Sequence, residues 1–571
     1  MKQKMWSFIW FMIIAVSEVA VQVIDSSMTF TTEATYYTNN PATTETESDD
    51  DNDNTLYEVT TEHGTVRGIK SGRVIRYFDI PYGQFSAENP FEEPNATQSW
   101  NPGVLKNTAH TSRCPQIDSE NKYIGDHNCL TLSIFVPEGA ENADVLFHIH
   151  DSSGNTGSGD PSKFGPKHLA NQGIILILPN YRIGALGFLC LQNVTAPGNA
   201  GLKDLHLALE WTNKNIRKFG GNNTNIVVSG SGFAGALVEY LILSNESRRF
   251  ISKAITESGS ALAPWALDRN PEETTKNLEN ELTKSENNAE TANIYTSLES
   301  YLEKLVRAAR SIDMLPCIEN NNGFLTETPW QLLNRGEFNI SLMTGSANHA
   351  ALDKALAQQT EEGLSQINND FSLLLPNDLK FNNVNEKNKI GRQIKTQYFG
   401  GINITTNDTP RLSQCYSDSF YLYPGIRAAR LFVRSGATIY FYEFSKGNNS
   451  FNGSRRGDSL NEVFSKDSTE GEVEEATTVN PTEAATTVNP TENGPTMLTL
   501  WASFIKDGKP SVEGIDWSNL REVRQPAQEV WLSIGDTMRV QRGFHGNRLQ
   551  LWEDIYQNHF IEHTTWMFWI V

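Results

Sequence analysis

The stretch from Phe219 to Trp265 constrains the fold more than any other part of this 571-residue chain. Its letters run FGGNNTNIVVSGSGFAGALVEYLILSNESRRFISKAITESGSALAPW. The apolar run from Ile226 to Val228 predicts a buried strand, the Gly/Ser letters after it predict a sharp turn, and a helix should begin near Ala234. A strand that enters a helix through a glycine turn is typical of sheets whose strands and helices alternate along the chain.

Other segments extend this pattern. VLFHIH (145–150) and GIILILPNYR (173–182) are nearly continuous apolar runs, which indicates strands buried on both faces. ISLMTGS (340–346) and ATIYFYEFS (437–445) predict two later strands of the same sheet. The polar segment 266–335 predicts a helical cap. An amphipathic run from Leu549 to Phe560 predicts the last helix.

These letters resemble the type-B carboxylesterase and cholinesterase family, whose pattern reads FGGDPxxVTLxGxSAGAxSV…LSP…FxxAIxQSGSAxxPWA. NYRIGALGFL, GDHNCLTLSIFVP and GNAGLKDLHLALEWTNKNIRKFGG match further parts of the family. The resemblance covers roughly residues 57–464 and 496–560. It implies an α/β-hydrolase fold with a mainly parallel central sheet that helices cover on both faces.

A hydrolase of this family needs a nucleophile at the elbow turn, an imidazole base and a carboxylate that orients the base. In gapless register with the family pattern, the nucleophile position falls on Gly232. The GxxxxEG pattern places Ala350 on the acid, and the GVxHxDELxYxF pattern places Arg456 on the histidine. A methyl group cannot orient an imidazole, and a guanidinium with a pKa above about 12 cannot be a general base near neutral pH.

The loop that should donate to the oxyanion is altered as well. The family's HGGGFxxGS becomes HDSSGNTGS, so Asp151 and Ser152 replace two glycines. A carboxylate beside a developing oxyanion opposes the charge that the site must stabilise. Loss of one triad member costs on the order of 10⁴–10⁶ in turnover. We therefore expect a carboxylesterase-like pseudoenzyme rather than an enzyme.

Neighbouring polar groups define the alternative of an esterase with a displaced nucleophile. Ser231 stands one residue before the turn position, and Ser258 follows the next predicted strand. His148 and His150 lie on the strand before the altered loop. We interpret both hydroxyls as turn or core groups and both histidines as packed side chains.

Three segments outside the regions that match the family differ in composition from the rest of the chain. Residues 1–20 begin with two lysines and an apolar run too short for a membrane span of about 20 residues, which predicts a secretory signal peptide. Residues 21–56 are acidic and Thr-rich, which predicts disorder. The hydrolase domain should span 57–571, with a mucin-like insertion at about 467–496 that contains ATTVNPTE twice.

Extracellular chemistry is indicated by sequons and cysteines. The resemblance implies a disulfide between Cys114 and Cys129. A second expectation, which does not come from the resemblance, pairs Cys317 with Cys415 and leaves Cys190, in the apolar GFLC run, as a free buried thiol. Nine N-x-[ST] sequons predict a secreted glycoprotein; they are Asn95, Asn193, Asn222, Asn245, Asn339, Asn403, Asn407, Asn448 and Asn452.

The net charge of −21 is concentrated in two stretches. Residues 5–66 hold eleven acidic residues and 467–505 hold seven, and neither contains Lys or Arg. The remaining body is close to neutral, which argues against a nucleic-acid partner. Asp51, Asp53 and Glu62 have EF-hand spacing, but Leu56 replaces the required glycine. No metal or cofactor is expected.

The predicted function is that of a secreted, catalytically inactive cholinesterase-like glycoprotein that acts in adhesion, in the matrix or as a protein-binding module. The resemblance to glutactin-like proteins and neuroligins implies an extracellular protein partner. Relatives often pair through their last helix, so the resemblance also implies that two copies can form a homodimer. No membrane span is expected. A carrier that holds an apolar ligand in the remnant of the gorge is a second alternative.

Overall fold

The computed structural model describes residues 57–86, 89–152, 155–286, 298–320, 323–447, 453–465, 497–520 and 529–562. The chain divides into two units, residues 1–56 with 86–90 and the remainder, and the second unit contains the helices and strands described here. The expected signal peptide (1–20), the acidic segment (21–56) and the repeat insertion (467–496) lie outside the described residues.

Strands make up the centre of the second unit. They are β1 (Tyr57–Thr60), β2 (Thr65–Ser71), β3 (Val74–Pro81), β4 (Gly83–Gln84), β5 (Asn95–Ala96), β6 (Val104–Leu105), β7 (Gln116–Ile117), β8 (Tyr123–Ile124), β9 (Thr131–Pro137), β10 (Ala143–Ile149), β11 (Ile175–Pro179), β12 (Gly221–Ser231), β13 (Lys253–Glu257), β14 (Ser341–Ala347), β15 (Thr438–Phe444), β16 (Val530–Ile534) and β17 (Met538–Arg542). Thirteen of them form one sheet in the order β1-β2-β3-β9-β11-β10-β12-β13-β14-β15-β16-β17, with β6 beside β2.

The middle of this sheet is parallel. Every neighbouring pair from β11 through β10 to β16 runs parallel. The pairs toward both ends run antiparallel, except that the short β6 lies parallel to β2. Parallel neighbours need crossover connections, and helices supply them. The α-helices are α2 (Lys167–Asn171), α3 (Gly184–Phe188), α4 (Ala200–Asn215), α5 (Phe233–Leu243), α6 (Asn245–Arg248), α7 (Pro271–Glu286), α8 (Leu298–Ala309), α9 (Pro329–Arg335), α10 (Leu352–Ala357), α11 (Glu361–Asn369), α12 (Val384–Phe399), α13 (Thr409–Ser417), α14 (Tyr423–Arg434), α15 (Leu460–Val463), α16 (Met497–Asp507) and α17 (Asn547–His559).

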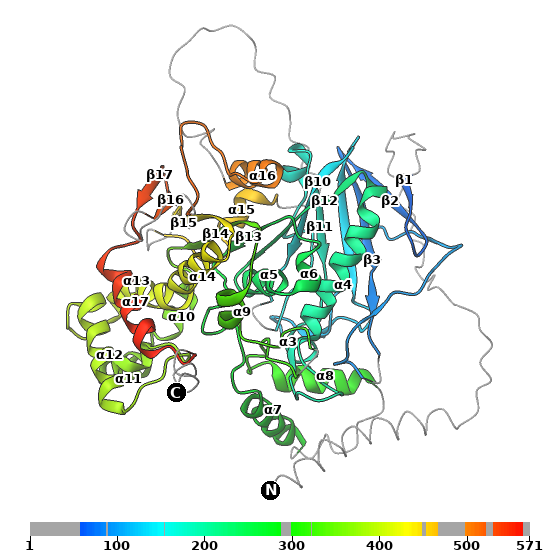
Figure 1. The fold of residues 1–571 in the computed structure, drawn as a ribbon. Coiled ribbons are helices and arrows are strands. Elements are labelled where there is room, and N and C mark those ends of the chain that lie inside the picture. Colours follow the sequence, from blue (N-terminus) through cyan, green and yellow to red (C-terminus); the bar gives the residue numbers. More distant parts are fainter. Residues whose placement is uncertain are drawn as a thin grey trace. The chain divides into compact units, whose positions relative to one another are not determined.

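Helices lie on both faces of the sheet (Figure 1). Side chains alternate between the faces along a strand, and Leu146, Val227 and Met343 pack in one cluster with Leu500 and Trp501 of α16. Among the described residues, that cluster contains no side chain of α4 or α5, although both helices contact β12. These two helices therefore cover the opposite face. The predicted sheet with two helical layers is confirmed.

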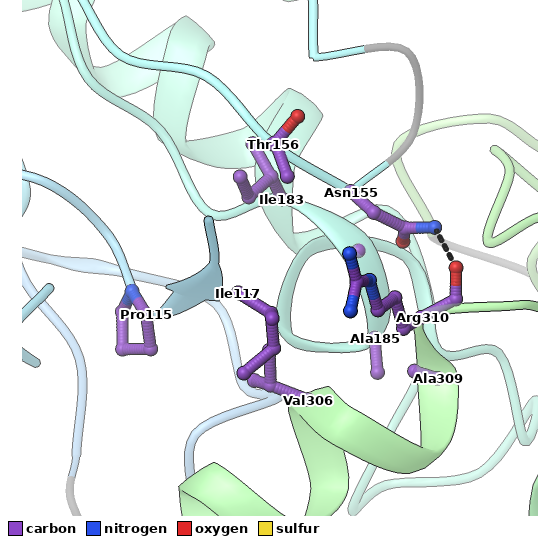
Figure 2. A pocket seen from close by; sticks show the side chains of 10 residues that line it. Pro115, Ile117, Asn155, Thr156, Ile183, Ala185, Val306, Ala309 and Arg310 are labelled. Atoms are coloured by element: carbon purple, nitrogen blue, oxygen red, sulfur yellow. Dashed lines mark hydrogen bonds between the residues drawn. The ribbon is translucent and has the colours of Figure 1, made fainter. Parts of the chain in front are cut away.

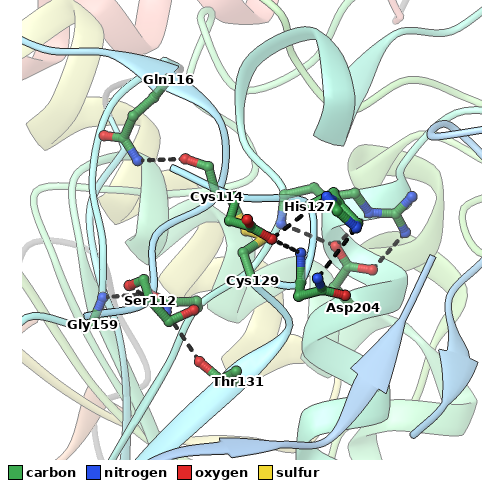
Figure 3. The surroundings of a disulfide bond; sticks show 12 residues. Ser112, Cys114, Gln116, His127, Cys129, Thr131, Gly159 and Asp204 are labelled. Carbon is green, nitrogen blue, oxygen red and sulfur yellow. Dashed lines mark hydrogen bonds and ion pairs between the residues drawn. A yellow bond between two sulfur atoms is a disulfide. The ribbon is translucent and has the colours of Figure 1, made fainter. Parts of the chain in front are cut away.

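The structure contains two disulfides. Cys114 and Cys129 are joined, as the resemblance implies (Figure 3). The pairing of Cys317 with Cys415 was wrong, because Cys317 is bonded to Cys190 across 127 residues of sequence. Cys415 is the free cysteine and is buried in α13. Burial raises the pKa of its thiol well above the usual value, so Cys415 is an unreactive core residue.

Within the described ranges, no helix combines the length and the apolar character that crossing a bilayer requires.

Candidate functional site

The elbow turn lies between β12 and α5, where the sequence placed it. Gly232 has φ 62° and ψ −126°, a conformation that favours glycine, and its N–H donates to the carbonyl oxygen of Glu257 at 2.9 Å. A Cβ atom added to Gly232 would lie 2.8 Å from Cδ of Arg456 and 2.9 Å from Oδ2 of Asp151. The space in which a nucleophilic side chain would begin is therefore filled by two residues from other parts of the chain.

Asp151 fills the position that an oxyanion would take. In this elbow, the backbone N–H after the nucleophile position is one of the oxyanion donors. Here that donor is the N–H of Phe233, and it donates to Oδ1 of Asp151 at 3.1 Å. Phe233 is also the first residue of α5, and a carboxylate at a helix N-terminus is favoured by the helix dipole. The carboxylate of Asp151 therefore accepts the hydrogen bond that the elbow pattern assigns to an oxyanion.

Arg456 packs over this carboxylate. Its Nε lies 3.7 Å from Oδ2 of Asp151, and its Nη1 donates to the hydroxyl of Tyr421 at 3.1 Å. Burial lowers the pKa of Arg456, but the nearby Asp151 and Tyr421 raise it by a larger amount. The pKa of Arg456 therefore lies above its ordinary value. A cation therefore occupies the position of the family's neutral base.

A buried carboxyl that the sequence analysis missed lies under the elbow. Glu257 ends β13, and its carboxyl accepts hydrogen bonds from the hydroxyls of Ser231 and Ser258 and, at 3.1 Å, from the N–H of Gly457. Burial raises the pKa of Glu257 in spite of these bonds. The sequence did contain a signal for this carboxyl, because TESGSA has Glu257 where the family pattern has Gln.

The acid position is near the base position but carries no functional group. The N–H of His349 donates to the carbonyl oxygen of Ser454 at 3.0 Å, and the N–H of Ser454 donates to Oδ1 of Asn348 at 2.8 Å. These bonds join the loop that holds Ala350 to the loop that holds Arg456. Ala350 itself is buried and brings only a methyl group.

The hydroxyls considered as displaced nucleophiles are structural. Ser231 and Ser258 are 3% and 0% exposed, and both donate to Glu257. Ser258 Oγ also accepts the N–H of Ala347 at 2.9 Å, which ties β13 to β14. Their bonds to a carboxyl, rather than to an imidazole, do not form the nucleophile–base pair that acyl transfer needs.

The two histidines are packed side chains. His148 Nδ1 lies 2.9 Å from Ser229 Oγ, and its ring contacts those of Phe164 and Phe464. His150 stacks on Tyr181 with ring centroids 4.6 Å apart. Burial lowers the pKa of each histidine to about 3, so both stay neutral in the folded chain.

These histidines predict a loss of stability in mild acid. The pKa of each histidine in the folded chain lies below its unfolded value of about 6.5. The contribution of each histidine to the stability of the fold is therefore fully present above pH 6.5 and is lost as the pH falls toward 3. Between pH 6.5 and 5 the loss is about 2 kcal/mol for each histidine. We expect His150→Phe to reduce the difference between the unfolding free energies at pH 7.5 and 5, measured in urea. An unchanged difference would contradict the assignment of His150 as buried and neutral.

The rest of the altered loop is tied to the helical cap. Ser152 is buried, and its carbonyl oxygen accepts from the N–H groups of Asn155 and Thr156. Asn155 Nδ2 donates to the carbonyl oxygen of Arg310, just after α8, at 3.2 Å (Figure 2). Gln116 exchanges two 2.9 Å hydrogen bonds with the backbone of Gly157 and braces the loop from the other side.

The cavity between this loop and α8 is small. Its walls include Thr156, Ile183, Val306 and Ala309, and its volume is about 10 Å³ (Figure 2). Space of that size holds about one water molecule. A larger hollow of about 590 Å³ beside α7 has mostly polar walls, such as Asn277, Asn280 and Lys284. Neither cavity fits the apolar ligand of the carrier alternative.

No group of three or more His, Cys, Asp or Glu side chains in the described parts of the chain is arranged to hold a metal ion.

Known proteins resemble this chain over most of its length. The sequence profile of the Carboxylesterase family matches residues 56–552. Esterase FE4 of Myzus persicae is 29% identical over 503 residues, which cover 81% of this chain and 83% of that protein. Neuroligin-3 of Mus musculus is 26% identical over 87% of this chain and 68% of its own length. The crystal structure of juvenile hormone esterase from Manduca sexta superimposes with a TM-score of 0.72 at 22% identity, over 88% of this chain and 100% of that chain.

These relatives share the α/β-hydrolase fold and include both esterases and neuroligins. The profile match extends over far more than half of the 571 residues and contains the whole elbow region. The chain belongs to the carboxylesterase family.

Proposed function

We propose that this chain is a secreted, catalytically inactive cholinesterase-like glycoprotein that acts as an extracellular adhesion, matrix or protein-binding module. The observation that carries the proposal is the hydrogen bond from the N–H of Phe233 to Asp151. A site that binds its own carboxylate at the oxyanion donor, under a guanidinium at the base position, opposes the charge that ester hydrolysis develops.

The proposed inactivity rests on several residues of the site together rather than on a single substitution. Gly232 has no nucleophilic group, Ala350 has no carboxylate and Arg456 stays protonated. Asp151 and Arg456 lie so close to Gly232 that the Cβ of a nucleophilic residue there would come within 3 Å of both side chains. The chain keeps the packing of the family and loses its chemistry, which suits a recognition role, although a fold alone does not assign one.

The surface is compatible with secretion and glycosylation. Asn95, Asn245, Asn339, Asn403 and Asn407 are exposed, and Asn193 and Asn222 are partly exposed, while Asn448 and Asn452 lie outside the described residues. With the signal peptide expected at residues 1–20, these sequons support passage through the secretory route. Similarity to neuroligins over 87% of the chain supports protein binding, and pairing with a second copy belongs to the same proposal.

Glycine at the elbow should be required for stability. We expect Gly232→Ser to lower the melting temperature, because Cβ would crowd Arg456 and Asp151 and because the backbone is strained for a non-glycine residue. Gly546 is a matched control, with φ 50°, ψ −130° and no atom within 4 Å of an added Cβ. Overpacking typically costs 1–3 kcal/mol, so Gly232→Ser should destabilise the chain by about that much more than Gly546→Ser. Equal effects would show that Asp151 and Arg456 do not fill the site.

The adhesion role is tested with beads coated with the purified secreted chain. Coated beads should retain cells above the level of albumin-coated beads. A Gly232→Ser/Ala350→Glu/Arg456→His variant should retain them equally, because adhesion does not use the elbow. No retention above albumin by the wild-type chain would contradict the adhesion role.

A further inference from the structure

A second pocket lies away from the elbow, where α9, α14 and α17 meet. Helices α9 and α17 both contact α14 (Figure 1). The pocket has a volume of about 140 Å³. The residues that line it include the aromatic Trp330, Tyr423 and Tyr556 and the basic Arg427, Arg430 and Arg434. We call it the α14–α17 pocket.

Arg427 is a buried cation whose two terminal nitrogens have no hydrogen-bond acceptor among the described residues. The residue is 8% exposed, and neither Nη1 nor Nη2 has a partner. Its guanidinium carbon lies 3.8 Å from the ring centroid of Phe560, 4.3 Å from that of Trp330 and 5.0 Å from that of Tyr556. Aromatic faces attract a cation but accept no strong hydrogen bond. Buried polar groups are nearly always satisfied, so an orphaned guanidinium points to a missing acceptor.

Arg430, the next arginine on α14, has hydrogen-bond acceptors for its guanidinium nitrogens. Arg430 donates to both carboxylate oxygens of Glu529, at 2.8 and 2.9 Å, and to Glu553 at 2.6 Å. Glu553 is therefore already used, although it lines the pocket. Arg434 is exposed and has no ion-pair partner among the described residues. The pocket thus presents two cations that its own acidic residue does not neutralise.

Two carboxyl groups, one buried and one partly buried, are close enough to interact electrostatically with Arg427 but do not hydrogen bond to it. They belong to Asp378 and Glu562, and burial raises the pKa of each. Asp378 Oδ1 accepts from the hydroxyl of Tyr556 at 3.0 Å, and its Oδ2 has no partner. A water molecule between Asp378 and Arg427 is therefore the competing explanation for the orphaned guanidinium.

We propose that the α14–α17 pocket binds a small carboxylate with a flat apolar body, whose oxygens accept hydrogen bonds from Arg427 while its body lies against Trp330 and Tyr556. Arginine suits this role because its planar fork matches the two oxygens of a carboxylate. Arg427 lines the pocket, but Nη1 and Nη2 are buried, so its guanidinium must rotate for the terminal nitrogens to reach an entering anion. The volume is below the 300–1,000 Å³ typical of sites for drug-sized ligands, so the ligand is small. This site does not depend on the proposed adhesion role.

The test uses the full secreted chain with benzoate as the probe and benzamide as its neutral isostere. Benzoate should raise the melting temperature in a saturable manner and give a heat of binding in calorimetry, and benzamide should bind at least about 10-fold more weakly, as the loss of a charge-assisted hydrogen bond implies. Arg427→Leu should abolish the benzoate shift.

Arg434→Gln is the matched control, since Arg434 lines the same pocket from an exposed position. It should weaken benzoate binding by a smaller factor than Arg427→Leu does. Equal binding of benzoate and benzamide by the wild-type chain would overturn the proposal and leave the water bridge to Asp378 as the explanation. Benzoate binding that survives Arg427→Leu would overturn it as well.

Discussion

A chain that carries Gly232→Ser, Ala350→Glu and Arg456→His should remain nearly inactive until Asp151→Gly is added. The three substitutions place a serine, a glutamate and a histidine at the positions that the family pattern assigns to the nucleophile, the acid and the base, but the N–H of Phe233 would still donate to Asp151. Removal of one oxyanion donor costs roughly 10²–10³ in turnover, and a carboxylate left in the hole also repels the developing charge. Turnover of an activated aryl ester should therefore be at least about 100-fold higher in the quadruple variant than in the triple variant.

The matched control for that comparison is Asp160→Gly in the triple variant. Asp160 lies in the same loop region, but its carboxylate accepts from the N–H of Ser162 at 2.9 Å and pairs with Arg113 at 3.1 Å rather than with the elbow. This substitution should not raise turnover. Equal turnover of the triple and quadruple variants would mean that Asp151 does not block the oxyanion hole.

Asp204→Asn should destabilise the fold by about 3–5 kcal/mol, because it leaves Arg182 as an uncompensated buried cation. Arg182 Nη2 donates to Oδ1 of Asp204 at 2.6 Å and Nε donates to Oδ2 at 2.8 Å, and both side chains are 0% exposed. The pair links the segment after β11 to α4, which leads into the elbow strand. The free energy of unfolding in urea measures the effect.

An exposed pair of similar geometry provides the comparison for Asp204→Asn. Arg67 and Glu58 also approach to 2.6 Å, but their side chains are 32% and 33% exposed. Exposed pairs contribute about 0–1 kcal/mol, so Glu58→Gln should change stability by less than that. Similar losses from the two substitutions would show that Asp204 and Arg182 are more accessible to water than the structure indicates.

The sequence predicted the fold well because the strongest signals are local. The apolar runs, the glycine turn and the helix after it depend on neighbouring residues. The start of α5 and both ends of β15 lie within one residue of the predicted positions, whereas β12 extends beyond the predicted Ile226–Val228 at both ends. The register of the family pattern also placed Gly232, Ala350 and Arg456 on connected loops and on the elbow. The pattern could be aligned at these three positions because it matches this chain at many other residues as well.

The contacts that decide the chemistry could not be predicted in the same way. The altered letters at Asp151 and Arg456 were visible, but their meeting above Gly232 depends on side chains from segments about 300 residues apart. The bonds of Glu257 to Ser231 and Gly457 likewise join separate elements. Cys190 and Cys317 are separated by 127 residues, and an odd number of cysteines at wide spacing permits several pairings.

Catalytic inactivity is tested most simply by hydrolysis of an activated short-chain aryl ester by the purified wild-type chain. The self-filled elbow predicts no turnover above that of a heat-denatured sample, and no covalent labelling by an organophosphate. Turnover that an organophosphate blocks would contradict the account, because a serine assigned here to structure would then be the nucleophile.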